Sequence, residues 1–326
     1  ENFGKLINCD AKQTALIPSV SYGLMSAIKN LPLDNGNTAL IVSDEFPSDF
    51  YSIRSWCNEN KKNLKIVTPP DNREKRGEVW NENILNSINE DTAVVVLSSI
   101  HWADGTLFKL KEIGEKCKKF NAMYIVDGTQ SVGALPIDVN EFKIDALICA
   151  AYKWLLGPYS IGMAYYSEFF NNGKPIEQTW INRSNAQDFS SLSNYVDGYT
   201  PGAGRYNVGE YGNFILLPML IRSLGQILEW NPAEIQEYAQ KLTKPLIDFL
   251  RENGFWIEDD NYRAKHMFGI LLPEKINPEE FLLNLRKRKI AVSVRGKSIR
   301  ISVHLYNNEA DINALIGILS ELKKVL

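Results

Sequence analysis

Apolar segments alternate with helix-like segments over the first two-thirds of the chain. Thr92–Ser98 (TAVVVLS) is nearly all apolar, which is typical of a strand buried on both faces. Ala122–Val126 and Ala146–Ala150 have the same character, and Lys109–Lys119 has the periodicity of a helix. Two shorter apolar runs add to the predicted strands: Thr38–Val42 and Leu64–Val67. Helices between apolar strands predict an α/β fold, in which a mostly parallel sheet carries helices on both faces.

The pattern changes at about Leu216. A long helical stretch, Leu217–Trp230, leads into a second helix that ends near Asn253. Short strands and further helices are predicted beyond it: strands at Met267–Leu272, Ile290–Val294 and Ser298–Val303, and helices at Pro278–Arg288 and Glu309–Val325. We therefore expect two domains, a large α/β domain at residues 1–216 and a smaller α+β domain at residues 217–326.

The chain carries a net charge of only −3 over 326 residues and lacks the basic stripe that nucleic acids require. We therefore expect no nucleic acid as partner. The chain also contains no run of about 18 apolar residues, so we expect no membrane as partner. A cytoplasmic location is expected. The four cysteines are scattered and the three histidines lack metal-binding spacing, which predicts free thiols and no metal site. The sequence begins with Glu1 rather than methionine, so we expect an N-terminal segment to be missing.

Polar side chains follow the predicted strands at the edge where open α/β sheets bind ligands. Lys153 comes shortly after Ala146–Ala150, in the apolar run ALICAAYKWLLGP. A partly desolvated amine has a lowered pKa and forms Schiff bases readily, although a surface lysine at a strand exit would give the same pattern. Asp127 ends another strand, where it could pair with the ring nitrogen of a cofactor such as pyridoxal phosphate (PLP) or form an Asx turn.

Three weaker signals accompany these two residues. Ser19–Gly23 precedes a helical stretch, so its hydroxyl and N–H groups could bind a phosphate or simply cap the helix. Phe46 follows a strand and could cover a flat cofactor or belong to the core. Arg300, in a predicted strand of the second domain, could hold a substrate carboxylate or face outward.

The order and spacing of these residues resemble the class V aminotransferase family of PLP enzymes of fold type I. That family includes cysteine desulfurases, kynureninases and isopenicillin-N-epimerase-like proteins. The resemblance extends from about Ser19 to Asn307 and is most specific in VDGTQSVGALPIDV and IDALICAAYKWLLGPYSIGMAYY. It implies the PLP-dependent transferase fold of type I and pyridoxal 5'-phosphate as cofactor.

The resemblance also implies roles for individual residues. Lys153 would form the Schiff base with the cofactor and move the proton at the α-carbon of an amino-acid substrate. Asp127 would bind the pyridine nitrogen, and Gln130 would contact the phenolic oxygen of the ring. Three residues would bind the phosphate: Val20 through its backbone, Ser21 through its hydroxyl, and Tyr152.

Further residues would surround the ring and the substrate. The segment FPSDFY resembles a kynureninase segment, which places Phe46 on the pyridine face and Asp49 near the cofactor. Trp102 would lie beside the ring, and Arg300 would grip the substrate carboxylate. Relatives are homodimers with shared active sites, so Asn207, at the end of the run GRYN, would reach the phosphate in the partner chain.

The departures from the family pattern bear on the reaction. The segment KRKIAVSVRGKSIR contains no cysteine, whereas cysteine desulfurases carry their nucleophile there, and Phe46 stands where desulfurases stack a histidine. We therefore expect an enzyme other than a cysteine desulfurase. Transamination is the first expectation, a kynureninase-like hydrolase or a C–S or C–C lyase the second, and epimerisation the third. A non-catalytic binding module with a PLP-enzyme fold is the alternative from another class of protein.

Overall fold

A computed structural model of the chain describes residues 1–272, 276–295 and 298–323. Its larger sheet has the strand order β1-β7-β6-β5-β4-β2-β3. The strand bounds are β1 Thr14–Ile17, β2 Thr38–Val42, β3 Asn63–Val67, β4 Thr92–Ser98, β5 Met123–Asp127, β6 Ala146–Ala150 and β7 Gly162–Tyr166. Strands β2 to β6 are parallel, whereas β7 is antiparallel to both of its neighbours. The predicted mostly parallel sheet is confirmed.

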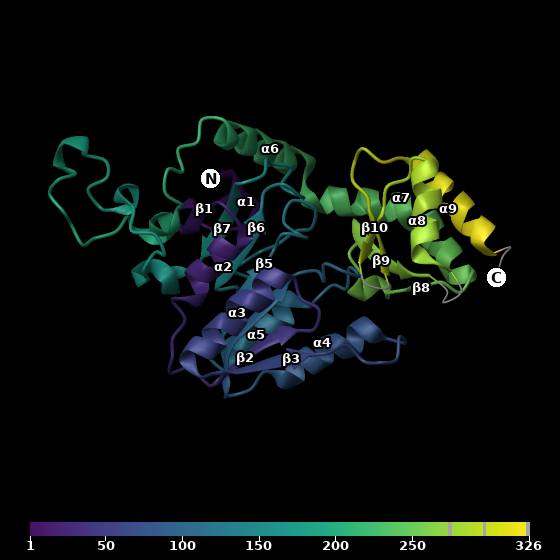
Figure 1. Cartoon of the computed structure of the whole chain (residues 1–326), viewed down its shortest axis with the longest axis horizontal. Helices are drawn as coiled ribbons and strands as arrows, with labels where there is room; N and C mark the ends of the chain where they lie inside the picture. Colours follow the sequence, from purple (N-terminus) through teal and green to yellow (C-terminus); the bar gives the residue numbers. More distant parts are fainter. Residues whose placement is uncertain (273–275, 296–297, 324–326) are drawn as a thin grey trace.

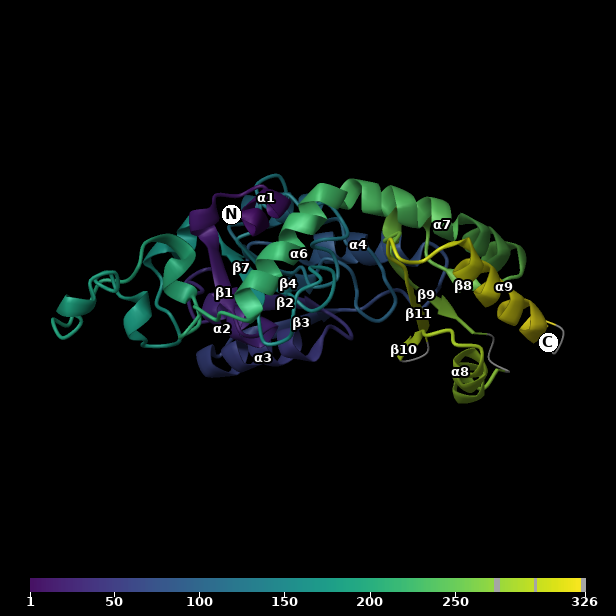
Figure 2. The same cartoon turned by 90° about the horizontal axis from the view of Figure 1, so that it is seen from above.

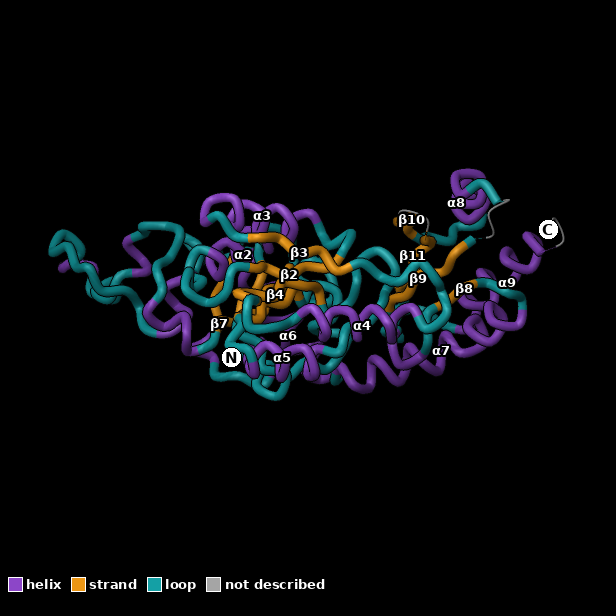
Figure 3. Tube along the Cα trace, turned by 90° about the horizontal axis from the view of Figure 1, so that it is seen from below, coloured by secondary structure: helices purple, strands orange, loops and turns teal. Residues whose placement is uncertain are grey.

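Helices cover both faces of this sheet, as predicted (Figures 2 and 3). One face carries α1 Asn2–Ile7, α4 Arg76–Ser87, α5 Leu110–Lys119 and α6 Leu216–Trp230; the other carries α2 Val20–Ile28 and α3 Pro47–Asn60. Helix α5 illustrates why these segments pack as they do. Leu110, Ile113 and Cys117 lie on one side and are buried, while the basic residues of its last turn point outward.

A smaller unit follows at the end of the chain (Figure 1). Its sheet, of order β10-β11-β9-β8, is antiparallel, and its helices pack on that sheet around a separate apolar core. The bounds are α7 Pro232–Glu252, β8 Trp256–Ile257, β9 Met267–Leu271, α8 Pro278–Lys287, β10 Ser293–Arg295, β11 Ser298–Ser302 and α9 Glu309–Lys323. The predicted small α+β unit is thus present. Helix α6 packs on the core of the larger unit. The domain boundary expected after residue 216 therefore stays a prediction.

One predicted strand is displaced. The sequence predicts a strand at Ile290–Val294, but β10 begins at Ser293. Lys289 has a φ of 60°, and the N–H of Ile290 bonds the carbonyl of Leu285, so this part of the segment closes the end of α8. The last predicted helical residues, Lys324 and Val325, lie outside the described residues.

Strand register brings several loops to one edge of the larger sheet. Gly162 of β7 pairs with Ile17 of β1 on one side and with Ala150 of β6 on the other. Asp127 of β5 pairs with Ser98 of β4. The segments after β1, β4, β5 and β6 therefore leave the sheet at the same edge, where loops of open α/β sheets form binding sites.

An arm connects β7 to α6. Residues 167–215 contain short turns and 3-10 segments, and the teal-green part of this connection projects away from the sheet in Figure 1. The arm exposes large aromatic side chains: 75% of Phe189, 96% of Tyr195 and 95% of Phe214 are accessible. Large exposed apolar side chains of this kind are typical of a surface that another protein chain covers.

Candidate active site

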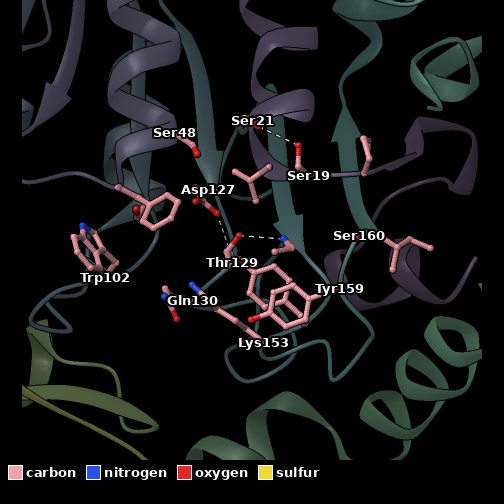
Figure 4. Close-up of a pocket in the computed structure, with 17 residues that line it drawn as sticks. Ser19, Ser21, Ser48, Trp102, Asp127, Thr129, Gln130, Lys153, Tyr159 and Ser160 are labelled. Atoms are coloured by element: carbon pink, nitrogen blue, oxygen red, sulfur yellow. Dashed lines mark hydrogen bonds between the residues drawn. The ribbon is translucent and has the colours of Figure 1, made fainter. Parts of the chain in front are cut away.

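A cavity of about 360 Å³ opens at the edge of the larger sheet where these loops converge (Figure 4). Eight of the residues predicted for the site line it: Val20, Ser21, Phe46, Trp102, Asp127, Gln130, Tyr152 and Lys153. Nine further residues complete the lining: Pro18, Ser19, Ser48, Ser98, Thr129, Ala150, Tyr159, Ser160 and Ile161. The volume suits a small organic molecule, because ligand pockets of proteins begin at roughly 300 Å³.

Lys153 lies half-buried on this cavity, three residues beyond β6. Its Nζ is 5.6 Å from the ring centroid of Phe46. Burial lowers the pKa of the amine, Asp127 partly opposes that shift, and Arg300 and Arg295 reinforce it. A lowered pKa increases the fraction of neutral amine, which is the form that attacks a carbonyl.

Asp127 is held rigidly at the end of β5. Its Oδ1 accepts a 2.8 Å hydrogen bond from the N–H of Thr129, and the Thr129 hydroxyl in turn accepts the N–H of Ala150 at 3.1 Å. The side chain is buried, and burial raises the pKa of its carboxyl group although the Thr129 bonds lower it. Glu45 raises this pKa further and Lys153 lowers it.

Asp49, on α3, is a second buried carboxylate beside Asp127. Burial raises the pKa of Asp49 well above its usual range, and the charges of Asp127 and Glu45 add to the shift. Glu45 is satisfied, because the N–H and hydroxyl of Ser98 both donate to it. Within the described residues, no side chain other than Asp127 lies within hydrogen-bonding reach of the Asp49 carboxyl oxygens. A cationic N–H bonded to Asp127, such as a pyridinium, would offset the negative charge buried there.

The N-terminus of α2 forms the opposite end of the cavity. The Ser19 hydroxyl caps the helix by accepting the N–H of Tyr22 at 3.2 Å, and it lies 3.0 Å from the Ser21 hydroxyl. The N–H groups of Val20 and Ser21 belong to the first turn, where a helix leaves its donors without intrahelical partners. Tyr152 stacks on Tyr159 with ring centroids 4.0 Å apart. Hydroxyl and N–H donors at a helix N-terminus are suited to a phosphate.

Aromatic side chains form the remaining wall. Phe46 precedes the first turn of α3, and its ring meets that of Trp102 edge-on with centroids 5.7 Å apart. The indole N–H of Trp102 donates to the carbonyl of Asp44 at 2.7 Å, which fixes the ring beside the cavity. A flat heterocycle would have an aromatic surface on this side.

Three predicted site residues do not line the cavity. Asp49 lies behind the wall next to Asp127, as described above. Arg300 lies on β11 and donates from Nη1 to the carbonyl of Trp102 at 2.5 Å, so it is adjacent to the cavity wall. Burial lowers the pKa of Arg300 to about 10, and Arg295 contributes to that shift. Asn207 lies at a different pocket, and its Oδ1 accepts the N–H of Leu16 at 2.7 Å.

Thr129 belongs to the polar residues directly after a predicted strand, in the run VDGTQS, where the sequence places candidate ligand-binding residues. Other lining residues were not predicted from the sequence. Tyr159 and Ser160 belong to the turn before β7, where Ser160 has a φ of 65°, and no local pattern marks them. Arg295 does not line the cavity, but it faces the same side of the small sheet as Arg300, since Ser293 pairs with Arg300 and Arg295 with Ser298.

Two other features are absent from the described residues. No group of His, Cys, Asp and Glu side chains among them could hold a metal ion. No helix of the part described is long and apolar enough to cross a bilayer.

The mostly parallel sheet with helices on both faces has the fold of PLP-dependent enzymes of fold type I. The class V aminotransferase model ("Aminotransferase class-V") matches residues 1–315. The chain therefore belongs to the class V aminotransferase family of PLP enzymes.

Individual relatives differ in activity. The uncharacterized aminotransferase YcbU of Bacillus subtilis is 22% identical over 315 residues, covering 96% of this chain and 80% of YcbU. A kynureninase of Cryptococcus neoformans is 25% identical over 343 residues, covering 96% and 74% of the two chains. Among solved structures, a lysine variant of C-DES with glycine covalently linked to PLP has a TM-score of 0.83 at 17% identity, covering 98% of this chain and 83% of C-DES.

Proposed function

We propose that this chain is an aminotransferase that holds PLP through a Schiff base on Lys153 and acts at the α-carbon of an amino acid. One observation carries the proposal: the Lys153 amine and the Asp127 carboxylate, from neighbouring strand ends, line one cavity of suitable volume. The N–H groups at the start of α2 support it, because they suit the phosphate of PLP.

Each residue has a defined task under this proposal. Asp127, assisted by Asp49, would keep the pyridine nitrogen protonated, and bound PLP would then act as the electron sink for charge that develops at the α-carbon. Lys153 would remove and return the proton at the α-carbon, which its lowered pKa favours.

Other groups would orient the reactants. Gln130 would donate to the phenolic oxygen, while Val20, Ser21 and Tyr152 would hold the phosphate. Phe46 and Trp102 would flank the ring. Arg300 would bind the substrate carboxylate by two parallel hydrogen bonds.

The proposal includes a homodimer in which each chain contributes to the active site of the other. Asn207 lies away from the cavity of its own chain, and the exposed aromatic residues of the arm lie in the same connection between β7 and α6. We infer that the arm packs on a second copy and brings Asn207 toward the partner's phosphate site. Equilibrium sedimentation of the wild type and of Phe214→Ser tests this assembly.

A kynureninase-like hydrolase is the second candidate. The segment FPSDFY favours it, because it sets Phe46 and Asp49 around the cofactor site and occurs in a chain 25% identical to a kynureninase. Epimerisation uses the same residues. We propose that desulfurase chemistry is absent, since no cysteine lies within residues 287–300.

The decisive experiment is a single-turnover measurement. The purified protein is loaded with PLP, and amino acids are added singly while absorbance is recorded. Conversion of the bound cofactor to pyridoxamine phosphate with release of a keto acid supports transamination. Release of alanine or sulfide with the cofactor unchanged supports a lyase or hydrolase. A protein that never binds PLP through Lys153 would be a non-catalytic module and would overturn the proposal.

A further inference from the structure

Trp154, the residue after Lys153, contacts Gln130 from outside the cavity. Its indole Nε1 lies 3.1 Å from Gln130 Oε1. An indole N–H can donate but cannot accept, so the atom that it meets must be the carbonyl oxygen of the carboxamide. The orientation of the Gln130 amide is therefore set by chemistry, with the oxygen turned to Trp154 and the NH₂ group free to turn elsewhere. In Figure 4, Gln130 lies between Trp102 and Lys153 on the cavity wall.

The backbone of Gln130 is fixed by the smaller unit of the fold. His266 Nε2 lies 2.8 Å from the carbonyl of Gln130, and His266 Nδ1 lies 2.6 Å from Gln236 Nε2. Gln236 Nε2 also donates to the carbonyl of Ala134, and Gln236 Oε1 accepts the N–H of Lys265. Gln236 must therefore donate to His266 Nδ1, which leaves Nε2 as the protonated nitrogen of a neutral imidazole.

The two residues that hold Gln130, Trp154 and His266, also contact each other. The Trp154 ring meets the His266 ring edge-on with centroids 4.4 Å apart, and His266 is fully buried. Gln130 is thus held at its side-chain oxygen by Trp154 and at its backbone oxygen by His266. A carboxamide held at both points cannot turn over without leaving the indole N–H unpaired, which is costly at a partly buried site.

We propose that Trp154 is a positioning residue that holds the Gln130 carboxamide with its NH₂ group toward the phenolic oxygen of PLP. The inference rests on the proposed function of Lys153 and Gln130. A donor at that oxygen competes with the proton of the neighbouring Schiff base. Loss of the correct amide orientation should therefore let the Schiff base keep its proton to higher pH.

The test is a spectroscopic titration of the PLP-loaded protein. Absorbance is recorded from acid to alkaline pH for the wild type, Trp154→Phe, Gln130→Ala and the double variant. We expect the midpoint of the Schiff base to rise by about one pH unit in each single variant, and no further in the double variant. Trp230→Phe is the matched control: it removes another indole, one that packs on His304 in the same region, and should leave the midpoint unchanged.

An isosteric replacement of Trp154 separates the effect of its hydrogen bond from the effect of its packing. Replacement of Trp154 by 3-benzothienylalanine keeps the ring and removes only the N–H, so it tests the inference even where Trp154→Phe folds poorly. A midpoint equal to that of the wild type in the isostere would overturn the inference, whether or not Gln130→Ala shifts it. A wild-type protein without a Lys153-dependent absorbance band would instead overturn the proposed function, so the two failures are distinguishable.

Discussion

The carboxylate of Asp127 lines the cavity, and its charge opposes ionisation of the Asp49 carboxyl group, which is buried directly behind it. The charge of Asp127 raises the cost of ionising Asp49, and burial raises the pKa of both carboxyl groups. This arrangement is unfavourable for the protein without cofactor and favourable for binding a cationic group against Asp127.

Asp49→Asn should therefore stabilise the protein that lacks PLP. A carboxyl pKa that is raised in the folded state means that stability is fully present below about pH 4 and is lost as the pH rises through the raised value. At pH 8 we expect the cofactor-free variant to exceed the wild type by at least about 1 kcal/mol in urea unfolding, with the difference shrinking toward pH 4. PLP affinity should fall in the same variant. Asp248→Asn, which breaks only an exposed pair with Lys244, is the control. A variant that is less stable at pH 8 would contradict the predicted repulsion.

Lys153→Ala should abolish covalent attachment of PLP. Borohydride reduction of the loaded wild type should fix the cofactor to the peptide that contains Lys153, and mass spectrometry should find no such adduct in the variant. Turnover should fall by about 10²- to 10⁴-fold or more, because the proton-transfer group is lost together with the attachment. Lys143→Ala removes an exposed lysine of the preceding loop and should have no effect on either measurement. An adduct at another lysine would shift the assignment of the Schiff base.

The parallel strands and the residues directly after them could be predicted from the sequence. Strands β4 and β6 are buried along their whole length, so they appear as continuous apolar runs, and Asp127 and Lys153 stand out against them. β1 is only four residues long, and its pairing with β7 joins segments almost 150 residues apart. That contact depends on tertiary packing and leaves no local pattern in the sequence.

The remaining site residues could not be predicted from the sequence for a similar reason. Trp154 has the sequence signature of a core residue, and only its hydrogen bond to Gln130 reveals a polar contact. Ser160 lines the cavity because of a turn with positive φ. Asp49 could be placed near the cofactor by resemblance, but its repulsion with Asp127 required the register of β5 and the position of α3.

Arg300→Lys should weaken substrate binding more than it changes the chemical step. A lysine keeps the charge but cannot form two parallel hydrogen bonds to a carboxylate. We expect KM for the amino acid to rise by about 10- to 100-fold, since hydrogen bonds to charged groups contribute about 1.5–3 kcal/mol. The Schiff-base spectrum without substrate should keep its Lys153-dependent band. Arg288→Lys, in an exposed pair with Glu321, is the matched control. An unchanged KM would remove Arg300 from the substrate site.

His266 should make the protein sensitive to acid. Burial lowers the pKa of His266 to about 4, from an ordinary value of 6.5. The unfolded chain therefore binds a proton between these values that the folded chain does not, so stability is present above pH 6.5 and is lost as the pH falls toward 4. At pH 5 this group alone should cost about 2 kcal/mol relative to pH 7. His266→Gln should remove that part of the loss in urea unfolding.

His101 is the control, because its pKa is shifted in the opposite direction. Burial alone would lower the pKa of His101, but the carboxylate of Asp104, 3.0 Å away, raises it overall. His101→Gln should therefore increase the loss between pH 7 and pH 5, and the same response from both variants would contradict the neutral state assigned to His266.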